Sequence, residues 1–230
     1  MNLFRRVLRL NSSFWTEDRS LTALLVYLLI VIFVLPPLTL SRGSEIVNAV
    51  FFSMVLVSGV FAANEHGHVR LLILILAAIA IVVHWLNLSS LPLQEADNIF
   101  SMLSLGTLAS VVLYHVFKEG NFTHHRILGA VSVYLLIGLI WSKAYHLVFL
   151  GDSNAFVFPH LQANEEIVYT RFVYFSYETL TTLGFGDIIP INPIAKSLVM
   201  IDGLTGQLFP AIMITRLVSL EIEARKNRNN

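Results

Sequence analysis

Long stretches without Asp, Glu, Lys or Arg recur along the chain and predict helices that cross a membrane. Four of them lie in the first half of the sequence, and each approaches the roughly 20 helical residues that span about 30 Å of hydrocarbon. They are Ser20–Ser41, Ile46–Asn64, Leu71–Gln94 and Asn98–Phe117. We therefore expect four spans in this half, with Glu95 and Asp97 in an outer loop between the last two.

Two further apolar stretches predict a fifth and a sixth span. Ile127–Leu150 contains one charge, Lys143, and a stretch from about Ile194 to Val218 is interrupted by Asp202. Between them, Tyr169–Asp187 is mixed in character and too short to cross a bilayer. The pattern predicts an all-α membrane protein with six transmembrane helices and one re-entrant element.

The composition excludes a soluble domain. Hydrophobic residues make up 56% of the chain and charged residues 13%, and the mean hydropathy is +0.72. A soluble domain carries about 25% charged residues. Fifteen basic and fifteen acidic residues balance, so no bulk field attracts nucleic acid. Without cysteine, disulfides and thiolate metal sites are excluded as well.

Basic residues predict the orientation, because cytoplasmic flanks of membrane spans carry an excess of Lys and Arg. Six spans place both termini on one side, and that side receives eleven of the fifteen basic residues. The other side receives Arg42, Lys143, Arg171 and Lys196. We therefore expect a multi-pass protein of the cell (inner) membrane with both termini in the cytoplasm.

The segment between the last two spans carries the candidate chemistry. Its first half is aromatic and compatible with a short helix, and its second half places Gly184 and Gly186 one residue apart, before Asp187 and Pro190. Non-helical backbone is tolerated at membrane depth only where protein buries it or where it lines a watery cavity. We expect a short helix that enters the membrane, ends midway and returns as an extended strand.

This segment closely resembles the pore signature of potassium channels, Thr-Thr-Val-Gly-Tyr-Gly-Asp. The matching residues are Thr181, Thr182, Leu183, Gly184, Phe185, Gly186 and Asp187. With an aromatic pore helix before it and a helix with a mid-span glycine after it, the resemblance covers about Arg126–Leu220. The chain looks most like small bacterial six-span members of the potassium channel superfamily. The resemblance implies a homotetramer in membrane lipid, with potassium ions bound in a selectivity filter and no organic cofactor.

In such a filter, backbone carbonyls replace the hydration shell of a potassium ion. Alternate residues must take left-handed backbone angles so that successive carbonyls face one axis, and glycine adopts these angles cheaply. The carbonyls of Thr182, Leu183, Gly184 and Phe185 are then expected to form the potassium sites, with Gly186 ending the filter. The Thr182 hydroxyl completes the innermost site, and each chain supplies a quarter of every ring.

Two departures from the signature leave a second interpretation open. Leu183 replaces valine and Phe185 replaces tyrosine, and the lost hydroxyl removes one hydrogen bond that could hold the filter open. The first interpretation is a potassium-selective channel, and the alternative is a weakly selective monovalent cation channel. A membrane enzyme is not expected, because no convergent nucleophile, base and oxyanion group is found.

The resemblance also implies residues that support the filter. Glu178 and Asp187 are placed as in bacterial channels where two acids meet behind the filter, and Tyr174 could donate its hydroxyl to Asp187. Such a pair of carboxylates in a confined site would share a proton and brace the filter. In the other interpretation, Asp187 is simply solvated at the outer mouth.

The last span carries the candidate gate. Gly206 occupies the position of the inner-helix hinge in the family, although a small residue there can equally serve helix packing. Pro210 adds a second reason to expect a bend. Asp202 lies mid-span, where it either attracts cations into the cavity or accepts a hydrogen bond from the base of the pore helix.

On this interpretation the chain has four parts. Residues 1–19 form a basic amphipathic cytoplasmic segment, which either lies on the inner leaflet or simply flanks the first span. Residues 20–120 form a four-span membrane domain, residues 121–220 the pore domain and residues 221–230 a short cytoplasmic tail. The fourth span has no Lys or Arg, so it lacks the gating charges of a voltage sensor.

Overall fold

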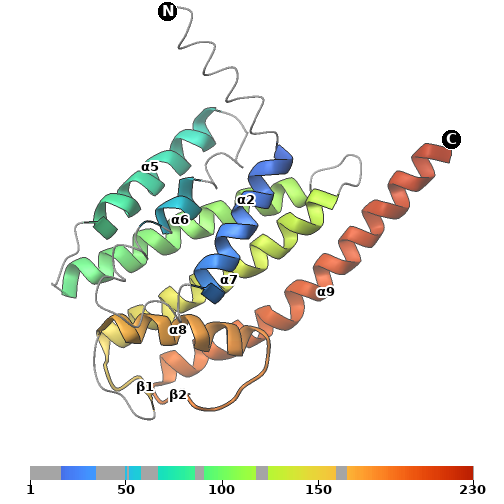
Figure 1. Cartoon of the computed structure of the whole chain (residues 1–230). Coiled ribbons are helices and arrows are strands. Elements are labelled where there is room, and N and C mark those ends of the chain that lie inside the picture. The colour runs from blue at the N-terminus through green and yellow to red at the C-terminus, as the bar shows by residue number, and fades with distance from the viewer. Residues whose placement is uncertain are drawn as a thin grey trace, which may run out of the picture.

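The computed structural model describes residues 17–34, 50, 52–57, 67–85, 91–117, 124–158 and 165–229. The described chain is almost entirely helical (Figure 1). The helices are α2 (Glu17–Leu29) with its π-helical continuation η1 (Ile30–Val34), α5 (Gly67–Trp85), α6 (Leu91–Phe117), α7 (His124–Gly151), α8 (Glu165–Leu180) and α9 (Pro193–Asn229). Residues 52–57 are helical too. Two short strands, β1 (Phe156–Val157) and β2 (Ile189–Pro190), depart from the all-α expectation.

Three of the described helices are long and apolar enough to cross a membrane. These spans are Pro92–Phe117, Arg126–Gly151 and Pro193–Ile222. Shorter apolar helices at Leu21–Val34 and Leu74–Val83 fall within the predicted first and third spans. Most of the predicted second span, and residues 1–16 of the predicted cytoplasmic segment, lie outside the described residues. A helical membrane protein is therefore supported, and the count of six spans stays a prediction.

Helix α6 corrects the predicted boundary between the third and fourth spans. It begins at Leu91, so residues 91–94 belong to the fourth helix, and Glu95 and Asp97 are helical instead of lying in an outer loop. Asp97 is tolerated in this helix because Lys143 Nζ of α7 lies 3.2 Å from its Oδ2. Charges that pair across two helices do not end a helix, so a charge-free stretch is not a reliable boundary here.

Helix α7 is the central helix of the described chain. Its span is 61% buried within the chain, whereas the span of α6 is 39% and that of α9 only 17% buried. Helices α2, α6, α8 and α9 all pack against α7, and α5 packs against α6 (Figure 1). Aliphatic side chains such as Leu24, Leu105 and Leu136 form the core between the N-terminal helices and α7. Helix α9 is thus the span that the rest of the chain covers least.

The segment after α7 returns to meet the segment before α9. Strands β1 and β2 pair antiparallel, with Phe156 opposite Pro190. An aromatic cluster joins α7, β1 and α8, and it contains Tyr145, Phe156, Phe158, Phe172 and Phe175. Most of its ring pairs are tilted or T-shaped, which is a favoured arrangement that adds to the burial of apolar area. The cluster fixes α8 against α7.

Candidate ion pathway

Helix α8 is fastened to α7 by side chains that donate to backbone carbonyls. Ser176 Oγ donates to the carbonyl of Gly138 at 2.6 Å, and Tyr177 Oη donates to that of Leu135 at 2.5 Å. A glycine is needed at this crossing, because a Cβ at position 138 would lie 2.5 Å from Tyr177 Cζ. The small residue lets the two helices approach closely enough for both hydrogen bonds to form.

The last four carbonyls of α8 all have hydrogen-bond donors. The N–H groups of Thr181–Leu183 bind the carbonyls of Tyr177–Thr179, each at 2.9 Å. The carbonyl of Leu180 accepts a hydrogen bond from Tyr134 Oη of α7 at 3.1 Å. Because terminal carbonyls of a helix have no partner inside it, these bonds fix the point and the direction in which the chain leaves α8.

Beyond α8, every second residue of the backbone has a positive φ. Thr182, Gly184 and Gly186 have φ of +60°, +60° and +78°, and no other residue of the described chain has a positive φ. Residues of alternating hand turn their carbonyls toward one side of an extended segment, as a ring of carbonyl ligands requires. The glycine spacing predicted two of these angles. The third, at Thr182, costs about 1–2 kcal/mol for a residue with a Cβ and had no sequence signal.

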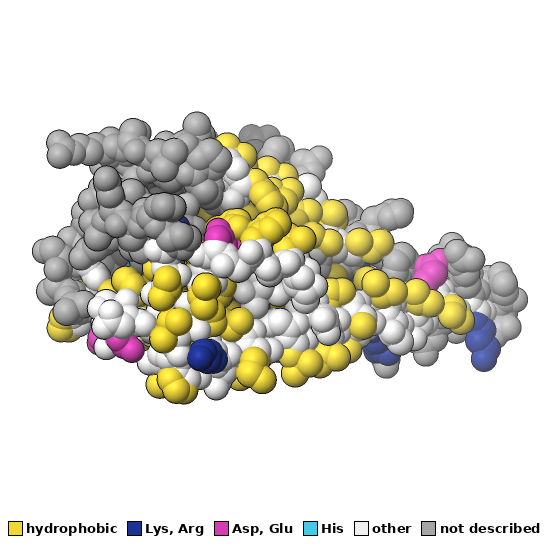
Figure 2. Space-filling view, turned by 90° about the horizontal axis from the view of Figure 1, so that it is seen from below, with side chains coloured by type: hydrophobic (Ala, Val, Ile, Leu, Met, Phe, Trp, Pro, Cys, Tyr) yellow, Lys and Arg dark blue, Asp and Glu magenta, His cyan; other side chains and the backbone are white. Residues whose placement is uncertain are grey.

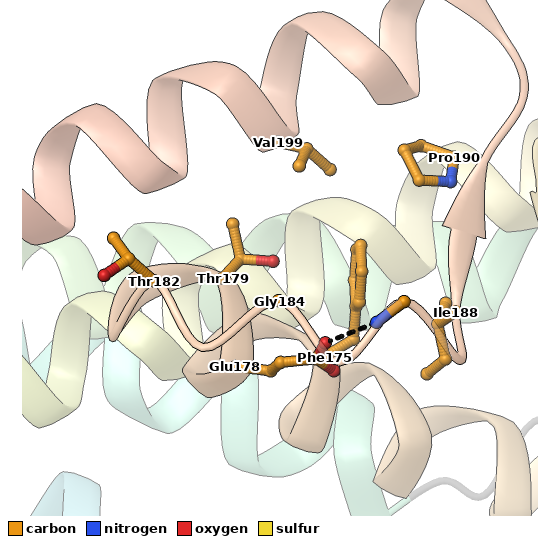
Figure 3. Close-up of a pocket in the computed structure, with 9 residues that line it drawn as sticks. Phe175, Glu178, Thr179, Thr182, Gly184, Ile188, Pro190 and Val199 are labelled. Atoms are coloured by element: carbon orange, nitrogen blue, oxygen red, sulfur yellow. Dashed lines mark hydrogen bonds between the residues drawn. The ribbon is translucent and has the colours of Figure 1, made fainter.

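Glu178 is hydrogen-bonded to this segment. It is buried, and its Oε1 accepts a hydrogen bond from the N–H of Gly186 at 3.2 Å (Figure 3). Its second oxygen, Oε2, is buried without a hydrogen-bond partner among the described residues. The Tyr174 hydroxyl lies close to the carboxylates of both Glu178 and Asp187. The structure therefore brings the three candidate support residues together on one side of the segment.

A cavity of about 270 Å³ lies between α8, the segment 181–187 and α9. Phe175 and Thr179 of α8, Thr182 of the segment and Val199 of α9 contribute to its lining (Figure 3). Sequence reasoning gave no sign of this space, because it is formed by elements that meet only in the tertiary structure.

The segment itself is uncovered in the single chain. All of residues 181–187 are exposed, including Leu183 at 62% and Phe185 at 68%. Irregular backbone at membrane depth cannot face lipid, because its polar groups would lack partners there. Figure 2 shows a second uncovered surface, where hydrophobic side chains run along the arm formed by α9 and charged ones gather near its far end. Lipid can cover that apolar arm, but the segment 181–187 needs further protein or water around it.

Gly206 lies where α9 crosses the C-terminal end of α8. A Cβ on Gly206 would lie 2.6 Å from the carbonyl carbon of Leu180 and closer still to its oxygen. The packing interpretation of this glycine therefore has direct structural support. Pro210 lies inside α9, which continues to Asn229. Because proline has no N–H, it leaves the carbonyl four residues earlier, that of Gly206, without its helical donor.

Asp202 does not lie on the open face of α9. Its side chain is fully buried, and its Oδ2 accepts a hydrogen bond from Tyr145 Oη of α7 at 2.6 Å. Its Oδ1 has no hydrogen-bond partner among the described residues, and Thr179 of α8 lies close to the same Tyr145 hydroxyl. The two expectations from sequence, a cavity charge and a partner at the pore-helix base, both missed Tyr145. Residues four apart share a helix face, and Asp202 faces inward with Gly206.

Lys143, which was predicted on the outer side of the membrane, is buried between helices, and its side of the membrane stays a prediction. It is 4% exposed, paired with Asp97 of α6, and its Nζ lies 4.4 Å from the ring centroid of Tyr169 of α8. One helical turn along, Asn98 and His146 are hydrogen-bond partners at 3.1 Å. These buried polar contacts join α6, α7 and α8.

Residues 133–223 match a family model described as an ion channel. The matched residues run from within α7 through α8 and the segment 181–187 to the last part of α9. The match indicates an ion channel in a membrane and points away from an enzyme. Channels of this family generally assemble as oligomers, which agrees with the exposure of residues 181–187 in the single chain.

Proposed function

We propose that this chain is one subunit of a homotetrameric, potassium-selective channel of the cell (inner) membrane, with both termini in the cytoplasm. The alternation of positive φ at Thr182, Gly184 and Gly186 carries the proposal. It occurs within the string Thr-Thr-Leu-Gly-Phe-Gly-Asp, in the part of the chain that matches the ion channel model. Potassium is the transported ion, and conduction is passive and uses no organic cofactor.

Four copies of the segment complete the ion sites. The carbonyls of Thr182, Leu183, Gly184 and Phe185 supply one quarter of each ring, and the Thr182 hydroxyl contributes to the innermost site. Several weak sites in a row let an ion enter without being trapped. Exposure of the whole segment in one chain is what a fourfold arrangement requires, because three further copies cover it.

Gating resides in the pore domain and not in a charged voltage sensor. Helix α6, the predicted fourth span, contains no Lys or Arg, so it carries no charge of the kind that moves in a membrane potential. The weak point of α9 is the turn between Gly206 and Pro210, where one backbone hydrogen bond is missing. This turn is the proposed gate.

Flux through reconstituted protein tests the proposal. Purified protein in liposomes should carry potassium in preference to sodium, barium should block the flux, and reversal potentials in mixed salts should follow potassium. Comparable permeability to sodium would instead establish the weakly selective cation channel. Absence of any flux from a correctly assembled protein would refute both.

A matched glycine pair links that flux to the segment. Gly186→Ala places a Cβ on a residue with φ of +78°, at a cost of about 1–2 kcal/mol for the left-handed angle. Gly151→Ala, at the end of α7, has neither a positive φ nor any atom within 4 Å of the added Cβ. We expect Gly186→Ala to lose potassium selectivity or flux and Gly151→Ala to retain both.

A further inference from the structure

Three helices converge at the end of the bundle that lies away from β1 and β2 (Figure 1). The end of α6, the start of α7 and the middle of α9 share a buried cluster of Val116, Ala130 and Met213, with Leu217 packed against it. Gly129 allows the close approach of α7 to α6, because a Cβ there would lie 2.8 Å from Val116 Cγ2. Packing thus sets the relative positions of the three helices at this end.

Two arginines border this cluster, and neither has an acidic partner among the described residues. Arg126 lies in the first turn of α7, one turn before Ala130, and Arg216 directly precedes Leu217 on α9. Ala130 of α7 and Leu217 of α9 pack in this one cluster, so the two arginines lie on helices in contact, and their charges repel each other. Within the described part of the chain, the ion pair between helices joins Asp97 and Lys143, and no carboxylate pairs with either arginine.

Two buried polar atoms near these helix ends lack hydrogen-bond partners among the described residues. Arg126 Nη1 is buried and has no hydrogen-bond partner in the described chain, and the same is true of Nε2 of His115 in the last turn of α6. A buried donor without an acceptor is costly. The start of α7 adds backbone N–H groups that have no acceptor within the helix. Apart from His115, which donates in one of its two tautomers, all of these groups can only donate.

We propose that these helix ends hold an anionic phosphate group, bound by Arg126 and Arg216 and bordered by His115. A guanidinium fork matches two phosphate oxygens, and a helix N-terminus favours the same ligand. Basic pockets between membrane helices hold the head groups of anionic lipids. The phosphate group proposed here can therefore belong to such a lipid, or it can be free phosphate. Its charge relieves the repulsion between the two arginines.

Such a ligand acts on the proposed gate. Arg216 follows Gly206 and Pro210 along α9, so a phosphate shared with Arg126 ties this half of α9 to α7. This consequence rests on the proposed function, whereas binding of the phosphate does not.

Lipid retention by the assembled protein tests the site. Protein in detergent is exposed to phosphatidylglycerol, to phosphatidylcholine or to inorganic phosphate, and bound molecules are counted by native mass spectrometry. Wild type should retain phosphatidylglycerol over phosphatidylcholine. Arg126→Gln and Arg216→Gln should each bind it about fivefold more weakly, on the order of the contribution of one basic residue near a charged membrane surface.

Two controls keep the outcome decisive. Lys226→Gln removes an exposed charge near the end of α9 and should leave retention unchanged. Arg126→Lys and Arg216→Lys keep the positive charge and should retain more lipid than the Gln variants. They show whether lipid is lost with the charge or because a substitution at this position prevents assembly. Phosphatidylglycerol retention that depends on both arginines identifies a lipid, whereas arginine-dependent retention of inorganic phosphate alone identifies a free anion. Equal retention by wild type and the Gln variants would overturn the site.

The result separates this inference from the proposed function. Protein that binds phosphatidylglycerol through both arginines but carries no potassium would leave the phosphate site intact and refute the channel. Wild-type protein that conducts potassium normally, with Gln variants that retain as much lipid as wild type, would refute the phosphate site and leave the channel intact.

Discussion

The contact between Gly206 and Leu180 makes a quantitative prediction about helix α9. In Gly206→Ala, the new Cβ meets the carbonyl carbon of Leu180 at 2.6 Å and its Cα at 2.9 Å, and real Cβ atoms essentially never approach other atoms within 3.0 Å. These are backbone atoms, so no side-chain rotation relieves the clash. Helices α9 and α8 must separate by roughly an ångström at this crossing.

The expected energy follows from two opposing terms. Overpacking costs about 1–3 kcal/mol, and a clash with backbone belongs at the upper end of that range. Alanine in a helix gains about 1 kcal/mol over glycine. We therefore expect Gly206→Ala to lose about 2 kcal/mol of stability. Gly203→Ala, one turn earlier on α9 with no atom within 4 Å of its added Cβ, should gain up to about 1 kcal/mol.

Both variants replace a helical glycine by alanine, so the gain in helix propensity is the same in each. The difference between their stabilities therefore measures the clash between α9 and α8. Thermal unfolding of the purified assembly should rank them as Gly203→Ala, wild type and Gly206→Ala, from most to least stable. Potassium flux should fall in Gly206→Ala, because Leu180 immediately precedes the segment 181–187. If the two variants were equally stable, the contact with Leu180 would not matter. Altered opening without a loss of stability would favour the hinge interpretation instead.

Three further predictions concern buried polar contacts. Tyr145→Phe removes the donor 2.6 Å from the buried Asp202 carboxylate and should cost roughly 1.5–3 kcal/mol, measured by thermal unfolding; unchanged stability would mean that another donor serves Asp202. Lys143→Met removes the ion pair with Asp97 and should cost about 3–5 kcal/mol, most of which the additional Asp97→Asn change should restore; no recovery would rule out the pairing. Glu178→Ala removes the acceptor for the N–H of Gly186 and should shorten open-state lifetimes in single-channel recordings. Glu178→Gln keeps an acceptor and should have the smaller effect. Lifetimes that are unchanged in both variants would exclude the bracing role.

The backbone of the ion pathway could be predicted from sequence where glycine dictates it. Gly184 and Gly186 indicated left-handed angles, and the structure has positive φ at both. Nothing in a threonine side chain favours such an angle at Thr182. Its φ is fixed by context, since its own N–H and that of Leu183 bind carbonyls at the end of α8. Angles that neighbouring hydrogen bonds impose leave no signal in residue type.

The surroundings of the charged residues were predicted less well than the backbone angles, and one reason accounts for this. Sequence reasoning treats a charge within an apolar stretch as a boundary or as a functional group in a cavity. Lys143 and Asp97 instead form an ion pair, and Tyr145 donates a hydrogen bond to one oxygen of Asp202. Each partner lies on a different helix, more than 40 residues away in the sequence. Pairing over that distance could not be inferred from a single sequence.

The contacts of α7 link the N-terminal helices to the candidate ion pathway. Lys143 pairs with Asp97 of α6 and also lies over the ring of Tyr169 of α8, and one turn further toward the N-terminus the carbonyl of Gly138 holds α8. Because Lys143 itself is buried, water has little access to its ammonium group, and we expect a shift of α6 to be passed on to α8. Asp97→Asn should therefore change potassium flux through a segment that it does not touch, while Glu95→Gln, an exposed residue on the same helix, should not. Equal flux in the two variants, measured in liposomes, would show that α6 does not act on the ion pathway through this pair.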